Sequence, residues 1–138
     1  MTLYAHWTAQ TCTVTLDGCG GTVDTDTLPC TFDAAYGVLP VPVRRGYTFI
    51  GWFTEADGSR RIAENSLVAT AADHTLYARW EATVYAISYE PDGGVADGEA
   101  WPGSYTVEQV PEISAPVDAL YPAYSHFLGW YEDEAFTV

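Results

Sequence analysis

Lysine is missing from this 138-residue sequence, and its five basic residues are all arginines: Arg44, Arg45, Arg60, Arg61 and Arg79. Because the chain also has 19 acidic residues, its formal net charge is -14. Binding to nucleic acid or to an anionic membrane surface requires clustered positive charge. We therefore predict no nucleic-acid partner. The lack of lysine also excludes Schiff-base catalysis by lysine, a Walker-type phosphate loop and intramolecular lysine–asparagine crosslinks.

Long apolar runs are missing as well. No signal peptide, transmembrane stretch or anchor motif is visible, so we predict no membrane insertion. Hydrophobic residues nevertheless make up 48% of the chain and aromatic residues 14%. This composition is sufficient to bury a core, and the length suits one ordinary domain or two small ones.

Cysteine is scarce, and the three cysteines all lie in the first quarter: Cys12, Cys19 and Cys30. An odd number leaves at least one of them unpaired within the chain, and their spacings match no zinc motif. One disulfide is possible, and Cys19 with Cys30 across a hairpin is the preferred pair. Three free thiols are the alternative.

Groups suited to catalysis or metal binding are scattered along the chain. No cysteine has a recognisable histidine partner, which argues against nucleophilic catalysis. The acidic clusters do not follow the spacing of a calcium loop. We predict no catalytic residue, no cofactor and no metal site among these groups: His6, His74, His126, Asp24 with Asp26, Asp92 with Asp97 and Glu99, and residues 132–134.

An internal repeat is the main feature of the sequence. The phrase TLYAHW at residues 2–7 returns as TLYARW at residues 75–80, 73 positions later. The same offset aligns residues 14–21 with 87–94, and Leu28-Pro29 with Trp101-Pro102. The phrase GYTFIGWF at residues 46–53 returns as SHFLGWY at residues 125–131, with an offset of 78.

These offsets divide the chain into three parts. Residues 1–7 read as the closing strand of a preceding repeat. Residues 8–80 are a complete repeat. Residues 81–138 are a second, divergent repeat that lacks its closing strand and has about five extra residues.

The repeat is predicted to be mostly β. Cys12, Val14 and Leu16 alternate with polar residues, which is typical of a half-buried strand. Residues 47–53 are apolar at both alternating sets, which predicts a strand covered on both faces. Residues 75–80 form the last strand of the repeat, and a short return strand is expected near Phe32. The proline-rich segments 37–46 and 110–124 are expected to be loops or short helical turns.

Recurring glycines and tryptophans mark the structural motif of the repeat. The glycine pairs suit turns that require positive φ. The tryptophans are expected to lie in the core, because a domain of this size needs large side chains to bury enough area. A carbohydrate-stacking platform is the alternative. The motif residues are Gly20, Gly21, Gly51, Trp52, Trp80, Gly93, Gly94, Gly129 and Trp130.

Three motifs in order carry a resemblance to a known family: DGCGG at residues 17–21, GYTFIGW at 46–52 and TLYARW at 75–80. Together they resemble the internalin B-type repeat, also called the Listeria–Bacteroides repeat. Cys19 stands where this family usually has asparagine, and Ser125 and His126 replace the Gly-Tyr pair in the second copy. The resemblance implies small α+β modules, mostly β, that form tandem ubiquitin-like β-grasp repeats in secreted or wall-attached bacterial proteins.

The resemblance implies a non-catalytic structural or interaction module, a stalk or spacer at the bacterial cell surface or in the cell wall. Two alternatives remain: an adhesin module that binds carbohydrate or a host protein, and an accessory domain of a large secreted enzyme. Any ligand would be an unknown protein or glycan. A closing strand without its own repeat at residues 2–7 also suggests head-to-tail self-association.

Overall fold

The computed structural model describes residues 1–91, 94–96, 98, 100–118 and 127–132. The chain divides into two compact units, Met1–Thr83 and Val84–Val138. The described residues form strands, turns and loops, with no helix among them, so the prediction of a mostly β protein is confirmed. The two proline-rich segments were expected to be loops or short helical turns. Residues 37–46 are loop and turn with one isolated bridge at Val43, as expected, whereas the described part of 110–124 contains the strand Pro116–Asp118, so the expectation is wrong there.

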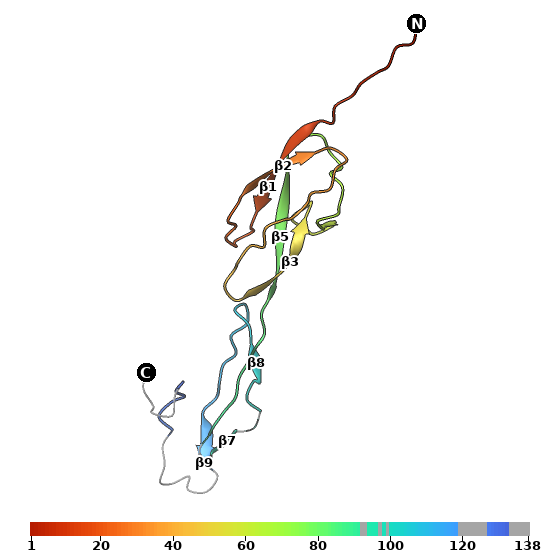
Figure 1. The fold of residues 1–138 in the computed structure, drawn as a ribbon. Coiled ribbons are helices and arrows are strands. Elements are labelled where there is room, and N and C mark those ends of the chain that lie inside the picture. Colours follow the sequence, from red (N-terminus) through yellow and green to blue (C-terminus); the bar gives the residue numbers. More distant parts are fainter. Residues whose placement is uncertain (92–93, 97, 99, 119–126, 133–138) are drawn as a thin grey trace. The chain divides into compact units, whose positions relative to one another are not determined.

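The first unit is built on a five-stranded sheet: β1 (Thr11–Asp17), β2 (Thr27–Thr31), β3 (Tyr47–Phe53), β4 (Arg61–Ile62) and β5 (His74–Ala82). The strand order is β2-β1-β5-β3-β4 (Figure 1). The first and last strands, β1 and β5, are neighbours and run parallel, whereas the other pairs are antiparallel. The last strand in sequence is therefore the central strand of the sheet.

One face of this sheet covers the core. Every second residue of β1 is buried, as its alternating pattern predicted, and Leu16 lies opposite Leu76 of β5. Leu76 is completely buried, which is the expected environment for a central strand. The core consists of Cys12, Val14, Leu16, Cys30, Trp52, Ile62, Val68, Leu76 and Ala78.

A β-bulge changes the direction of side chains in β3. Phe49 lies opposite Trp80 and Gly51 lies opposite Arg79, so Ile50 is the extra residue. Gly51 has a φ of 153°, and a Cβ atom there would lie 2.6 Å from Nε of Arg61. The prediction that both faces of this strand are covered is therefore correct only for residues 51–53, because the residues before the bulge are partly or largely exposed.

The turn after β1 uses two left-handed residues. Cys19 has a φ of 46° and Gly20 a φ of 88°. The Gly21 N–H donates to the Gly18 carbonyl at 2.9 Å and closes the turn. Cys19 thus adopts the conformation for which asparagine is favoured at this position of the repeat.

The described part of the second unit contains four short strands: β6 (Tyr85–Ala86), β7 (Gly94–Ala96), β8 (Ser104–Tyr105) and β9 (Pro116–Asp118). Among the described residues, β6 pairs only with β8 and β7 only with β9. The Val95–Val117 pair of β7 and β9 corresponds to the isolated Thr22–Val43 bridge of the first unit. The second unit thus repeats local geometry of the first despite its divergent sequence.

The first hairpin of the second unit is two residues longer than its counterpart. Cys12 lies opposite Cys30, 18 residues later, whereas Tyr85 lies opposite Tyr105, 20 residues later. The alignment of Trp101 with Leu28 is therefore wrong in register. The pairing continues through the Ile87 N–H to the Gly103 carbonyl, which brings Trp101 opposite Tyr89.

Replacing Trp52 with alanine should destabilise the first unit by roughly 3–5 kcal/mol, a typical loss for a large aromatic side chain removed from a core. The indole is 2% exposed and packs in the core. The control is Trp7→Ala, because Trp7 is 88% exposed. Urea denaturation of dilute protein measures both, and equal stability of Trp52→Ala and the parent would contradict the core assignment.

Candidate functional site

Trp80 joins the closing strand to the first turn of the repeat. Its indole N–H donates to the Gly18 carbonyl at 2.9 Å, and its ring packs edge-on against Phe49 at 5.5 Å between centroids. A Cβ atom on Gly21 would lie 2.3 Å from Cζ2 of Trp80. Glycine at this position therefore allows the indole to approach the turn. Trp80 is half-buried, so the prediction of a largely buried side chain holds only in part.

Trp52 lies deeper in the core. Its indole N–H donates to the Pro40 carbonyl at 2.8 Å, which satisfies the buried polar group. Phe49 packs edge-on against this ring at 5.6 Å and so connects the two tryptophans of the first unit. Gly20 lies outside this cluster, beside the guanidinium of Arg44.

The second unit has an aromatic cluster of its own. Trp101 and Trp130 both donate to the Ser114 carbonyl, at 3.1 and 3.3 Å, and their rings are nearly perpendicular at 86°. Phe127 packs edge-on against Trp130, as Phe49 does against Trp52. The two rings thus pack against each other around one shared carbonyl acceptor.

The three motif glycines of the second unit differ in their surroundings. Gly94 donates its N–H to the Pro91 carbonyl at 2.9 Å and packs closely against Pro116. Gly129 has a φ of 154°, nearly the same as Gly51. Gly93 lies outside the part of the chain that the structure describes.

The disulfide joins Cys12 to Cys30, and Cys19 is the free thiol. The predicted Cys19–Cys30 pair is therefore wrong. The register of β1 and β2 places Cys12 and Cys30 directly opposite each other with their Cα atoms 5.0 Å apart, whereas Cys19 lies in the turn beyond β1. In the second unit, the cross-strand pair of stacked rings Tyr85 and Tyr105 occupies the equivalent position.

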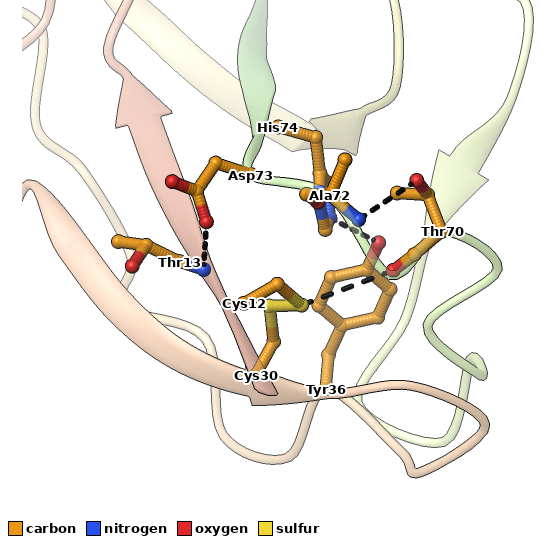
Figure 2. The surroundings of a disulfide bond; sticks show 8 residues. All are labelled: Cys12, Thr13, Cys30, Tyr36, Thr70, Ala72, Asp73 and His74. Carbon is orange, nitrogen blue, oxygen red and sulfur yellow. Dashed lines mark hydrogen bonds between the residues drawn. A yellow bond between two sulfur atoms is a disulfide. The ribbon is translucent and has the colours of Figure 1, made fainter. Parts of the chain in front are cut away.

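His74 lies beside this disulfide (Figure 2). The sulfur atoms of Cys12 and Cys30 and a ring nitrogen of His74 all lie within 4.8 Å of one another. The interpretation of His74 as an isolated residue without a cysteine neighbour is therefore wrong. The sequence did not indicate this proximity, because His74 lies 44 or more positions after each of the two cysteines.

Hydrogen bonds determine the tautomer of His74. Its Nδ1 lies 3.0 Å from the Ala72 carbonyl, which can only accept, so Nδ1 carries the proton. In the neutral imidazole, Nε2 then accepts a hydrogen bond from the Tyr36 hydroxyl at 2.7 Å. Burial raises the pKa of Tyr36, which keeps this hydroxyl protonated as a donor.

In the described structure, this cluster has no ligand atom free to bind a metal ion. The two sulfurs are bonded to each other, and both ring nitrogens of His74 have partners. A metal would need a free thiolate and a free imidazole lone pair. The hydrogen bonds of His74 therefore attach the start of β5 to Tyr36 and Ala72. Nearby, the Thr13 N–H donates to the Asp73 carboxylate at 2.7 Å and adds a further link.

The free thiol of Cys19 is a poor nucleophile. Burial raises the pKa of Cys19, and the neighbouring negative charge of Asp17 raises it further, while Arg44 acts in the opposite direction. A raised pKa reduces the thiolate fraction, and the thiolate is the reactive form.

Among the described residues, no other candidate group joins this cluster. His6 is exposed in the segment before β1, and Asp24 and Asp26 are exposed in the loop between β1 and β2. Several candidates lie outside the described residues: His126, Asp92, Asp97, Glu99, Asp133 and Glu134.

The Listeria-Bacteroides repeat domain matches the chain twice, at residues 13–79 and 85–138. The chain belongs to this family. The two matches agree with the tandem copies recognised from the repeated motifs, so this prediction is confirmed. Membership of a repeat-domain family is consistent with a non-catalytic role.

Two curated relatives of this repeat pair come from Evansella cellulosilytica. One, named "Putative Gly-rich membrane protein", is 36% identical over 99% of the chain. The other, named "Putative membrane protein", is 35% identical over 99% of the chain. The chain spans only 16% and 19% of their respective lengths. No helix capable of crossing a membrane occurs among the described residues of the repeat pair.

Replacing Gly21 with alanine should destabilise the first unit by roughly 1–3 kcal/mol, because the new methyl group would overlap the Trp80 ring. Gly103→Ala is the control, since a Cβ there would have no neighbour within 4 Å. Thermal denaturation followed by tryptophan fluorescence measures both variants. A parent-like melting temperature for Gly21→Ala would show that the indole does not need this space.

Removing the disulfide by the double replacement Cys12→Ser and Cys30→Ser should lower the free energy of unfolding by about 3 kcal/mol, the effect expected for closing a loop of roughly this size. The matched control, Cys19→Ser, leaves the disulfide intact and should change stability little. Urea denaturation compares the variants. A larger loss for Cys19→Ser than for the double variant would contradict the observed pairing.

Proposed function

We propose that this repeat pair is an extracellular spacer segment of a bacterial cell-surface protein. The observation that supports the proposal best is the parallel pairing of β1 with β5. Because parallel strands point the same way, the chain enters the first unit at one end of the sheet and leaves at the other. In a unit of this kind, the two ends of the chain lie at opposite ends of the sheet and not beside each other.

The register of the two strands gives the length of the unit. His74 lies level with Val14, so the path from Thr11 to Ala82 spans about eleven residue steps along the strands. At about 3.3 Å per step, this corresponds to roughly 36 Å. Each unit of this kind would therefore add about this length to the path of the chain through it, which is a useful property for a spacer.

The parallel pairing of β1 with β5 also helps the unit to resist a pulling force applied at its two ends. Pulling on the two ends of the unit moves β1 and β5 in opposite directions along their length. All hydrogen bonds between them are then loaded together, whereas pulling neighbouring ends apart breaks such bonds one at a time. The disulfide adds a covalent link between β1 and β2.

Composition and relatives also support the proposal. A net charge of -14 keeps copies soluble through mutual repulsion. Both relatives are named as membrane proteins and are at least five times as long as the chain, as expected for a module within a large surface protein. The adjacency of the first and last strands leads us to propose, further, that the unit is a β-grasp fold without a helix in its described part.

Single-molecule force spectroscopy tests the proposed function. Handles at residue 1 and at Thr83 load β1 against β5 in shear, and we expect a discrete unfolding event at high force. The matched control places handles at Thr48 and Glu81, which are exposed and directly opposite each other on β3 and β5. That geometry unzips the strands, and the unfolding force should be clearly lower. Equal forces would contradict the load-bearing role.

The same measurement also tests whether the Cys12–Cys30 disulfide shortens the part of the chain that can be extended by force. With handles at residue 1 and Thr83, a reductant should increase the length gained on unfolding by about 55 Å. The 18 residue steps from Cys12 to Cys30 then extend at about 3.4 Å each, in place of the 5.0 Å between the two bonded Cα positions. The variant with Cys12→Ser and Cys30→Ser should show this longer extension without reductant. An equal length gain for oxidised and reduced protein would contradict a disulfide that carries force between Cys12 and Cys30.

A further inference from the structure

We propose that the first unit binds one Zn²⁺ ion through Cys12, Cys30 and His74 when its disulfide is reduced. The two sulfur atoms and a ring nitrogen of His74 already lie within 4.8 Å of one another (Figure 2). Two thiolates and one imidazole are a zinc donor set in which water takes the fourth position. The spacing of these residues in the sequence matches no zinc motif, so only the sheet brings them together.

The sheet places the three ligands on its core face. Cys12 lies opposite Cys30 on β2, and both side chains are 7% exposed. His74 begins β5 on the other side of β1, where it lies opposite Val14. Residues two positions apart in a strand share a face, so Cys12 points the same way as Val14, which is 1% exposed. The three ligands therefore occupy neighbouring positions on the adjacent strands β2, β1 and β5.

The imidazole of His74 is oriented as in a zinc site. A histidine that binds a metal commonly donates the N–H of its other ring nitrogen to a backbone carbonyl or a carboxylate. Nδ1 of His74 makes such a contact with the Ala72 carbonyl at 3.0 Å. Nε2 then carries the lone pair, whose partner in the disulfide form is the Tyr36 hydroxyl at 2.7 Å. Zn²⁺ would replace this hydroxyl at the lone pair.

Reduction of the disulfide supplies the two sulfur ligands. A dithiol transfers two electrons to the Cys12–Cys30 bond, which breaks, and the dithiol itself becomes a disulfide. Its two protons pass to the two cysteine sulfurs. Zn²⁺ then releases these protons to solvent and bonds both sulfurs. An ion held by two thiolates and a neutral imidazole has no net charge, which suits the buried position of both cysteines.

The three ligand atoms need only a small adjustment. In a tetrahedral site with Zn–S bonds of about 2.3 Å and a Zn–N bond of about 2.0 Å, the ligand atoms lie roughly 3.5–3.8 Å apart. The nitrogen of His74 therefore has to approach the sulfurs by at most roughly 1 Å, while the two freed sulfurs separate. The side chains of His74 and Tyr36 are half-buried, which gives an ion access to the cluster.

The ion would connect three strands, whereas the disulfide connects two. Cys12 and Cys30 belong to β1 and β2, and His74 adds β5. In the second unit, Tyr85 and Tyr105 stand at the positions of the two cysteines. Among the described residues, only the first unit therefore has this donor set, and the expected stoichiometry is one Zn²⁺ per chain.

Zinc titration of the 138-residue chain tests the proposal, with Cys19→Ser as the parent so that the free thiol cannot bind the ion. A phosphine serves as reductant, because it offers no competing thiolate, and a chromophoric chelator competes for Zn²⁺. The reduced parent should bind one ion, and the oxidised parent should bind none in the same range. Co²⁺ in place of Zn²⁺ should give the visible absorption of a tetrahedral ion with thiolate charge transfer. Equal affinity of reduced and oxidised protein, or a reduced parent without this Co²⁺ spectrum, overturns the proposal.

Two matched variants separate binding by His74 from its packing role. His74→Gln and Tyr36→Phe both remove the hydrogen bond between these side chains. Only His74→Gln removes a ligand, and it should weaken binding by more than tenfold, since loss of even an outer partner of a ligand costs about 10–100-fold. Tyr36→Phe should bind Zn²⁺ at least as tightly as the parent, because Nε2 is then free. Parent-like affinity of His74→Gln, or equal losses in the two variants, overturns the assignment of His74.

The two cysteines are tested by the double variant Cys12→Ser and Cys30→Ser in the same background. It should bind no Zn²⁺ under reducing conditions. The melting temperature gives a second readout, because an ion that binds only the folded chain stabilises it. Zn²⁺ should raise the melting temperature of the reduced parent and leave those of the oxidised parent and the double variant unchanged. Zinc binding of equal strength in the double variant places the ion elsewhere and overturns the proposal.

Discussion

The structure of the first unit depends on the pairing of its first strand with its last. β1 and β5 meet at the centre of the sheet, and both present buried aliphatic side chains to the same core. Contacts between residues about 60 positions apart therefore form the middle of the molecule, and local hairpins complete its edges. Such a topology has a high contact order, which favours slow folding of the first unit as a whole.

Trp80 shows how the repeat motif supports this pairing. Its backbone belongs to the closing strand β5, its indole N–H bonds to the turn after β1, and its ring packs against Phe49 of β3. Gly21 leaves room for the ring. The three phrases that define the family thus meet around one side chain, which explains physically why they occur together in one repeat.

The sequence predicted the strands and their grouping well because those features depend on local patterns. The alternation around Val14 and the recurrence of TLYARW indicated β1 and β5, and the repeat indicated the burial of Trp52. Features that depend on register were missed. The partner of Cys30, the two additional residues before Trp101 in the second hairpin and the proximity of His74 to Cys12 all follow from which residues face each other across strands. Composition and spacing do not contain that information.

The Cys12–Cys30 bond has a consequence for the response of the chain to proteases. A single cut anywhere between these residues leaves both fragments covalently attached, so a nicked first unit retains its strands and can reclose. In the second unit the corresponding position is held by the stacked rings of Tyr85 and Tyr105, which cannot retain a severed segment. Proteases would therefore remove the two repeats at different rates, and the disulfide-containing copy would outlast its neighbour.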